Sequence, residues 1–193
     1  MANVNPRKVF QIQNDLAKVV LQKFEANDIK FFQELEGLVQ KHAVPESIAD
    51  KLARFGDIAR SKGIKLYYDT TTGTDPDIMN RLPNAVVSLN PAPQGNWKKV
   101  DTQNGTTESK MLKTAIIMLL SCAVDTFIAE LQKGTFDTLS TYRIIFLEEK
   151  DAQGRALKLV CNRDGDGRLR LYVLQVNPVN TWYVDGNAWL QQQ

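Results

Sequence analysis

TESKMLKTAIIMLLSCAVDTFIAELQK, residues 107–133, is the stretch that decides the expected fold. At one end Thr106 or Thr107 can cap a helix and Glu108 supplies a favourable negative charge, and at the other end Gly134 follows where a helix commonly stops. Between these ends, apolar side chains occupy most of a helix circumference and leave only a thin polar stripe. Because such a helix must be covered on most sides, the segment predicts one long core helix at the centre of the protein.

A membrane-spanning role for this segment is not expected. Its apolar block, residues 115–124, lies between Lys113 and Asp125, whereas a bilayer requires about 20 consecutive apolar residues. We therefore expect a buried helix and no membrane association.

Helical periodicity also dominates the amino-terminal third of the chain. Pro6 begins a helical pattern, Asn27 interrupts it, and Pro45 opens another helix that ends before Gly63. These signals predict a helical module at residues 1–63.

The helical module carries more aromatic surface than a short helical hairpin can bury. Phe24, Phe31 and Phe32 lie close together in the sequence, which predicts self-association or the binding of another protein. Basic residues on these helices are interleaved with acidic ones, and this mixture favours a solvated face over a surface for polyanions.

The carboxyl-terminal part of the chain has the pattern of a β-meander. Three alternating segments, residues 141–149, 155–162 and 168–176, are separated by the turn sequences DAQG and RDGDG. With a short strand expected at residues 64–68, they define an α+β domain at residues 64–193. The predicted fold class is α+β, with an N-terminal helical module and a long central core helix packed on a mainly antiparallel C-terminal β-meander.

A long irregular segment is expected at residues 69–106, which are rich in Thr, Asn, Pro and Gly. Residues 85–89 fit a strand and residues 77–81 a helical turn. A loop of this length usually covers a site, mediates an interaction or is disordered. Trp97 is its most informative residue, because an aromatic ring among polar neighbours anchors the loop to the core or contacts a partner.

Composition excludes several classes of function. The 193 residues are 43% hydrophobic and 24% charged with a formal net charge of +2, so no strong overall field favours polyanions.

The amino terminus does not resemble a secretory signal, which predicts a cytoplasmic location. Cys122 and Cys161 are expected to be reduced packing residues. A single histidine and no close cysteine pair argue against zinc and iron–sulfur sites, and no cofactor is expected.

Alternation along the predicted strands gathers basic residues on one face of the sheet. Arg168, Arg170 and Tyr172 share one side of the last meander strand, and Arg143 and Lys158 are assigned to the same side from the neighbouring strands. A basic and aromatic face can bind single-stranded nucleic acid through phosphate contacts and stacked bases. An ordinary solvated face has the same composition, so the sequence leaves both interpretations open.

Two metal-dependent alternatives rest on carboxylates. The motif NRDGDGRL, residues 162–169, copies the start of a calcium loop, but Val173 stands where the glutamate ligand belongs, and a tight hairpin turn explains the glycines better. Asp77, Glu148 and Lys150 have the residue types of a magnesium-dependent nuclease, although their spacing is poor.

A final aromatic cluster, Trp182 and Trp189, lies in the turn-rich carboxyl-terminal segment, which is expected to form a short hairpin. These residues are expected to pack against the rest of the protein or to form a protein-binding patch. The favoured function is that of a non-catalytic, cytoplasmic interaction or assembly protein, as a homodimer or with another protein. Nucleic-acid binding through the sheet face is the alternative, and a metal-dependent nuclease is the third hypothesis.

Overall fold

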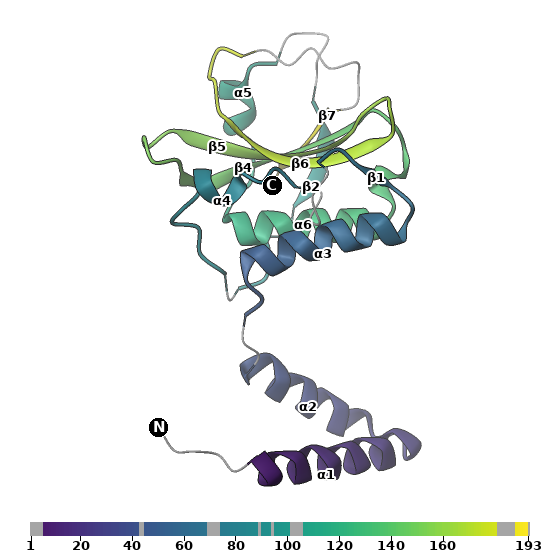
Figure 1. Ribbon diagram of the computed structural model, residues 1–193. Coiled ribbons are helices and arrows are strands. Elements are labelled where there is room, and N and C mark those ends of the chain that lie inside the picture. The colour runs from purple at the N-terminus through teal and green to yellow at the C-terminus, as the bar shows by residue number, and fades with distance from the viewer. Residues whose placement is uncertain are drawn as a thin grey trace. The chain divides into compact units, whose positions relative to one another are not determined.

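The computed structural model describes residues 6–42, 45–68, 74–88, 90–93, 95–100, 106–180 and 188–192 (Figure 1). The chain forms two compact units, Met1–Val44 and Pro45–Gln193. Among the described helices, none combines the length and the apolar character needed to cross a bilayer.

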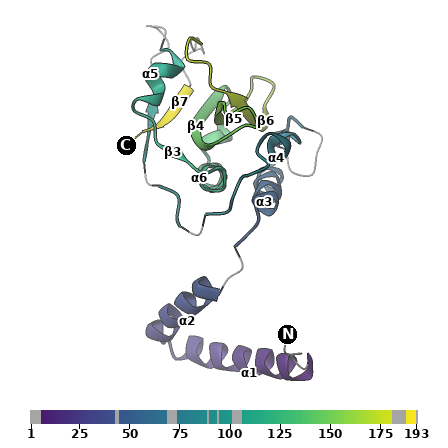
Figure 2. The ribbon, with the colours of Figure 1, turned by 90° about the vertical axis from the view of Figure 1, so that its left-hand side faces the viewer.

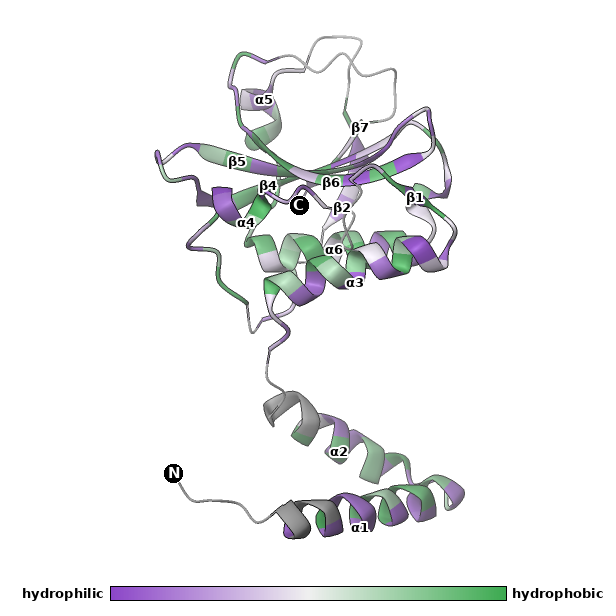
Figure 3. Cartoon of the chain, viewed as in Figure 1, coloured by the Kyte–Doolittle hydropathy of each residue, from purple (hydrophilic) through white to green (hydrophobic). Residues whose placement is uncertain are grey.

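The described residues of the amino-terminal unit form two amphipathic helices, α1 (Pro6–Glu25) and α2 (Ile29–His42). Asp28 caps α2, because its Oδ1 accepts the Phe31 backbone N–H at 3.0 Å while its Oδ2 accepts a hydrogen bond from Lys23 Nζ at 2.8 Å. The bond from Lys23 holds the pKa of Asp28 below its usual value. Figure 3 shows apolar and polar residues alternating around both helices.

In the part of the chain that the structure describes, the carboxyl-terminal unit is a seven-stranded sheet flanked by helices. Its strands are β1 (Lys65–Leu66), β2 (Asn96–Lys99), β3 (Ile117–Met118), β4 (Thr141–Lys150), β5 (Ala156–Arg163), β6 (Arg168–Gln175) and β7 (Ala188–Gln192). They lie in the order β1-β6-β5-β4-β7-β2, with β3 beside β4. The helices are α3 (Ile48–Ser61), α4 (Ile78–Arg81), α5 (Glu108–Leu112) and α6 (Leu120–Gln132), and a 3-10 turn follows at Thr135–Asp137.

The predicted β-meander is confirmed, since β4, β5 and β6 are antiparallel neighbours. Three parallel pairings extend it, β1 with β6, β3 with β4 and β7 with β4, so the sheet as a whole is mixed. Between β5 and β6, Gly167 has a φ of 80° and Asp164 Oδ1 accepts the Arg168 backbone N–H at 2.9 Å. The RDGDG sequence therefore forms the tight hairpin turn that was predicted in preference to a calcium loop.

Helix α6 lies across one face of the sheet, which we call the inner face, and the opposite face is the outer face. Helix α3 packs against α6 (Figures 1 and 2). This layer contains the main core, in which Phe55 of α3 and Phe127 of α6 join Ile145, Leu159 and Leu171 of the sheet. Each fully buried side chain of this kind contributes roughly 1.5–3 kcal/mol to folding. The α+β fold class predicted from the sequence is confirmed.

A second apolar cluster lies on the outer face of the sheet, on the side of α5 (Figure 2). Met111 of α5 packs with Ile144 and Phe146 of β4 and with Val160 of β5. The short helix therefore covers the middle of the outer face, and Tyr172 of β6 packs at the edge of the same cluster.

The single long helix predicted for residues 107–133 is wrong in its extent. The segment forms α5, then pairs as β3 with β4, and only afterwards becomes α6. Strand β7 pairs only with the first half of β4, so the second half would be left with an unpaired edge. Strand β3 pairs with this edge at Phe146 and Leu147. Glu149 then caps α6, accepting the Leu120 backbone N–H with its two oxygens at 3.0 and 2.9 Å. The apolar pattern alone fits both a buried helix and a buried strand. Pairing with β4 determines which of the two forms here.

The third helix belongs to the second compact unit, although the sequence places it in the module at residues 1–63. Leu52, Phe55 and Ala59 of α3 are buried in the main core. The boundary between the compact units consequently follows Val44.

Where the structure describes the segment expected to be irregular, residues 69–106, it contains two short elements. Helix α4 matches the helical turn predicted at residues 77–81, whereas β2 was not predicted. Residues 85–88 do not form the expected strand, and Leu89 lies outside the described residues. The sequence of β2, NWKK, is too short and too polar to give a strand signal, and pairing with β7 is what holds it in the sheet.

Candidate functional site

The outer face of the sheet carries a cationic and aromatic group of side chains near β1 and β6, which we call the outer cluster. The Arg170 guanidinium lies against two rings, with Cζ 4.9 Å from the Tyr67 centroid and 4.6 Å from the Tyr172 centroid. Arg168 Cζ lies 5.7 Å from the Tyr67 centroid. Asn162 Oδ1 accepts a hydrogen bond from Arg170 Nε at 2.7 Å, which fixes the orientation of the guanidinium. These five residues make up the outer cluster.

Tyr67 was not predicted as a member of this surface. It follows β1, and the parallel pairing of β1 with β6 brings it beside Arg170. Tyr67 is 43% exposed, whereas burial raises the pKa of Tyr172 to about 12. The outer cluster therefore combines the exposed ring of Tyr67 and the more buried phenol of Tyr172 with two guanidinium groups.

Two of the predicted basic residues do not join the outer cluster. Lys158 is 2% exposed and forms a buried ion pair with Glu108 of α5. Burial lowers the pKa of Lys158, and the bond to Glu108 opposes that shift. Arg143 lies on the inner face, because it pairs in register with Cys161 of the main core. Alternation gives the period of each strand, but a register shift of one residue exchanges the faces, so the sequence alone misassigned Arg143.

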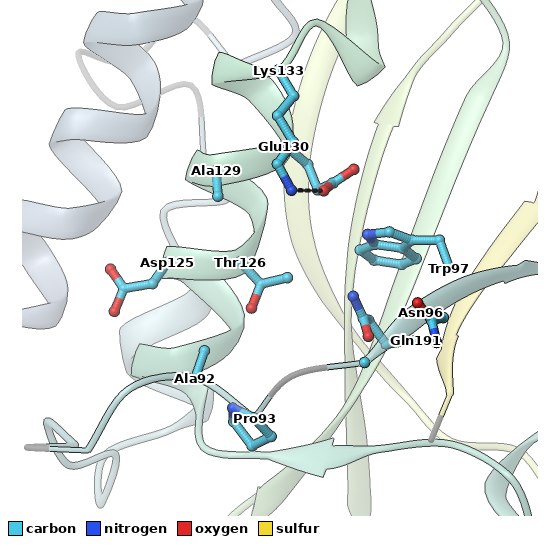
Figure 4. Close-up of a pocket in the computed structure, with 11 residues that line it drawn as sticks. Ala92, Pro93, Asn96, Trp97, Asp125, Thr126, Ala129, Glu130, Lys133 and Gln191 are labelled. Carbon is cyan, nitrogen blue, oxygen red and sulfur yellow. Dashed lines mark hydrogen bonds and ion pairs between the residues drawn. The ribbon is translucent and has the colours of Figure 1, made fainter.

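On the inner face, a cavity of about 390 Å³ opens between α6 and the edge formed by β2 and β7 (Figure 4). Trp97 of β2 and Gln191 of β7 form one wall, and Thr126, Glu130 and Lys133 of α6 form the opposite wall. Lys133 Nζ donates a hydrogen bond to Glu130 Oε1 at 3.2 Å. The cavity thus has an aromatic and amide side facing a charged side.

Next to the strand wall of this cavity, the Arg143 guanidinium lies between two tryptophan rings. Its Cζ is 5.2 Å from the Trp97 centroid and 4.6 Å from the Trp189 centroid. Trp97 in turn stacks on Phe127 of α6, with the centroids 6.1 Å apart and an interplanar angle of 26°. Trp97 therefore anchors its segment to the core, one of the two roles expected for it.

Four polar atoms in this region are buried and have no hydrogen-bond partner among the described residues. They are Trp97 Nε1, Arg143 Nε and Nη1, and Gln191 Oε1. Each unpaired buried group costs about 1–3 kcal/mol, so their concentration in one place calls for a specific explanation. Burial also lowers the pKa of Arg143 to about 10, while the negative charge of Glu130 opposes this shift. We call Trp97, Arg143, Trp189 and Gln191 the inner cluster.

The predicted aromatic surface of the helical module is brought together at the joint of α1 and α2. The Phe31 and Phe32 centroids are 5.4 Å apart, and the Phe24 and Phe32 centroids are 6.4 Å apart. Phe24 is nevertheless 72% exposed. Among the described side chains of these helices, six further large apolar ones are also exposed, namely Ile12, Leu16, Val19, Leu21, Ile29 and Leu38.

The three residues of the nuclease hypothesis come from two separate segments of the chain. Asp77 precedes α4, and Glu148 and Lys150 lie near the end of β4. Within the described ranges, no group of three His, Cys, Asp or Glu side chains is placed to hold a metal ion. Trp182, assigned to a protein-binding patch, lies outside the described residues.

Sequence reasoning missed Tyr67 and Gln191, which complete the outer and the inner cluster. Tyr67 becomes significant only through a strand pairing between distant segments. Gln191 lies two residues after Trp189 and therefore on the same face, but this signal requires that β7 be recognised as a strand. The chain matches no protein-family model, no characterised protein and no solved structure.

Proposed function

We propose that this protein is a non-catalytic interaction protein that self-associates through α1 and α2. One observation carries the proposal: among the side chains described in this unit, at residues 8 and 11–38, none is buried. A compact unit of this size needs an apolar core to offset the entropy lost on folding. A second set of helices has to supply the missing contacts.

A continuous apolar stripe on α1 supplies the contact surface. Ile12, Leu16 and Val19 are 59%, 49% and 42% exposed and are separated by four and three residues, so they lie on one side of the helix. Phe24 extends the apolar surface to the joint with α2. An exposed stripe of this kind is typical of helices that pair with other helices.

A second copy of the same chain is the partner that fits this stripe best. Two helix pairs related by a two-fold axis can bury like stripes against one another as a four-helix bundle. Charges of both signs alternate on these helices, for example at Asp15 and Lys18 and at Lys30 and Glu34. No strong like-charge field therefore opposes the approach of two copies, and none attracts a partner of opposite charge.

Sedimentation equilibrium of the full chain tests this proposal. We expect a dimer that Leu16→Glu weakens at least about 100-fold, or about 2.7 kcal/mol, because the substitution buries a carboxylate in the stripe. Asn14→Glu is the matched control, since Asn14 is exposed and lies on the other side of α1. This control adds the same charge and should leave the dimer unchanged.

Two results would contradict self-association through α1 and α2. One is a wild-type chain that stays monomeric while circular dichroism shows both helices to be formed. The other is equal dimerisation of the wild type and of Leu16→Glu, which would locate the interface elsewhere.

A second candidate function, binding of single-stranded nucleic acid, is favoured by the outer cluster. Tyr67 and Tyr172 offer ring faces for bases, and Arg168 and Arg170 offer charges for phosphates. Fluorescence anisotropy with labelled single-stranded DNA and RNA at two salt concentrations tests it. We expect Arg168→Ala with Arg170→Ala to weaken binding and to reduce the salt dependence.

The matched control for this test removes the same charge elsewhere. Lys113→Ala with Lys150→Ala changes two exposed lysines that lie outside the outer cluster. Equal loss of binding in the two double variants would mean that net charge alone attracts the nucleic acid, which would exclude a specific site on the sheet.

A further inference from the structure

The cavity beside the inner cluster has the size and the polarity of a small-ligand site. Its volume is about 390 Å³, and Figure 4 shows the Trp97 ring and the Gln191 amide facing the Thr126 and Glu130 side chains across it. Cavities of this size, with a few convergent polar groups, commonly hold small molecules. Gln191 is only 5% exposed, so its polar atoms have little access to bulk water.

The unpaired atoms of the inner cluster specify the groups that a ligand should carry. Trp97 Nε1 and the two Arg143 nitrogens are donors and require acceptors, whereas Gln191 Oε1 is an acceptor and requires a donor. Trp97 and Gln191 are direct cross-strand partners in β2 and β7, so an unpaired donor and an unpaired acceptor belong to neighbouring residues. A ligand that satisfies both must present an acceptor and a donor close together.

The charges around the cavity favour an anionic acceptor. The Glu130 carboxylate already accepts hydrogen bonds from Lys133 and Thr135, and Asp125 is paired with Lys51 and Arg54. The Arg143 guanidinium, by contrast, has no ion pair among the described residues and contacts the faces of Trp97 and Trp189. A carboxylate can accept hydrogen bonds from a guanidinium with both oxygens.

We propose that this cavity binds a small carboxylate that carries an adjacent N–H donor, the chemistry shared by free amino acids and by the carboxyl-terminal residue of a peptide. The carboxylate accepts hydrogen bonds from Arg143 and Trp97, and the N–H donates to Gln191 Oε1. Trp97 and Gln191 line the cavity whereas Arg143 does not, so this binding mode requires the Gln191 side chain to rotate and open a path to the guanidinium. The site is independent of the α1–α2 interface, since all of its residues lie in the second compact unit.

Isothermal titration calorimetry and tryptophan fluorescence of the full chain test the proposal with four probes. Glycine carries a carboxylate and an ammonium group, N-acetylglycine a carboxylate and an amide N–H, acetate only the carboxylate, and acetamide only the amide. We expect glycine or N-acetylglycine to bind with a change in tryptophan emission, and acetate and acetamide to bind at least about tenfold more weakly. Preference for glycine indicates a site for free amino acids, and preference for N-acetylglycine a site for peptide ends.

Two variants link binding to this cavity. Ala129 is a half-exposed lining residue on α6, so Ala129→Phe should fill the cavity without disturbing the core and abolish binding. Gln191→Glu places a carboxylate of the chain beside Arg143 and Trp97. It should raise the melting temperature of the unliganded protein and abolish the response to the probes. Gln33→Glu, at an exposed position outside this unit, is the matched control and should leave binding unchanged.

The proposal is overturned if none of the four probes binds, or if acetate binds as tightly as the probes that carry a donor. It is also overturned if Ala129→Phe binds like the wild type. The Leu16→Glu variant provides a separate check, because it should bind the probes normally even if self-association through α1 fails.

Discussion

The buried ion pair between Lys158 and Glu108 makes the stability of the α+β unit sensitive to one substitution on the outer face. Lys158 is 2% exposed and Glu108 is 0% exposed. Glu108 also accepts hydrogen bonds from the Asn177 backbone N–H at 2.9 Å and from Asn180 Nδ2 at 2.8 Å. The pair therefore attaches α5 both to β5 and to the chain that follows β6.

Lys158→Met removes the positive charge and leaves the Glu108 carboxylate buried. Breaking a buried pair in this way typically costs 3–5 kcal/mol, and because two donors to Glu108 remain, we expect a loss of about 3 kcal/mol. Adding Glu108→Gln removes the buried charge while keeping an acceptor for Asn177. The double variant should therefore recover to within about 1 kcal/mol of the wild type.

Urea unfolding, monitored by tryptophan fluorescence, measures the stability of the compact unit that contains the ion pair. The tryptophans at positions 97, 182 and 189 all lie between Pro45 and Gln193. With an m value of about 2 kcal/mol/M, a loss of about 3 kcal/mol lowers the midpoint by about 1.5 M. A loss below about 1 kcal/mol in Lys158→Met, or a double variant no more stable than the single one, would refute the reasoning.

Three further perturbations follow from single contacts. Phe127→Ala removes a fully buried ring that stacks on Trp97, and it should lower the unfolding free energy by about 3–5 kcal/mol in urea titrations. Ser47→Ala removes the side-chain acceptor for the Asp50 backbone N–H at 3.1 Å and should lower the melting temperature by an amount equivalent to about 1 kcal/mol. Burial raises the pKa of Glu149 above its usual 4.5. Between 4.5 and the raised pKa, the folded state therefore holds a proton that the unfolded state has lost, so stability should fall as pH rises through this range. Glu149→Gln should abolish that decline in unfolding experiments across the same pH range, and a decline that persists would assign it to another group.

Local patterns predicted the meander because each of its strands alternates and each turn carries its own signal. Antiparallel strands joined by DAQG and RDGDG are neighbours in both sequence and space, so short-range information suffices. The same alternation correctly grouped Arg168, Arg170 and Tyr172 on one face. It failed for Arg143, because the phase between strands depends on the register.

The parallel pairings could not be predicted from the sequence, and two of them changed a predicted feature. Pairing of β3 with β4 interrupts the helix expected at residues 107–133, and pairing of β1 with β6 adds Tyr67 to the outer cluster. Parallel partners are distant in sequence, and segments of two residues carry no periodicity of their own.

The sequence by itself determined the α+β class, the meander and the amphipathic character of α1 and α2, since these depend on local periodicity and turn chemistry. Only the tertiary structure decided which charges are buried and which surfaces stay open. Lys158 and Arg143 look like surface residues in the chain, yet one is enclosed with Glu108 and the other lies between Trp97 and Trp189. Burial of a charge depends on partners contributed by segments that are distant in the sequence. These segments come together only when the chain folds, so no local pattern predicts the burial.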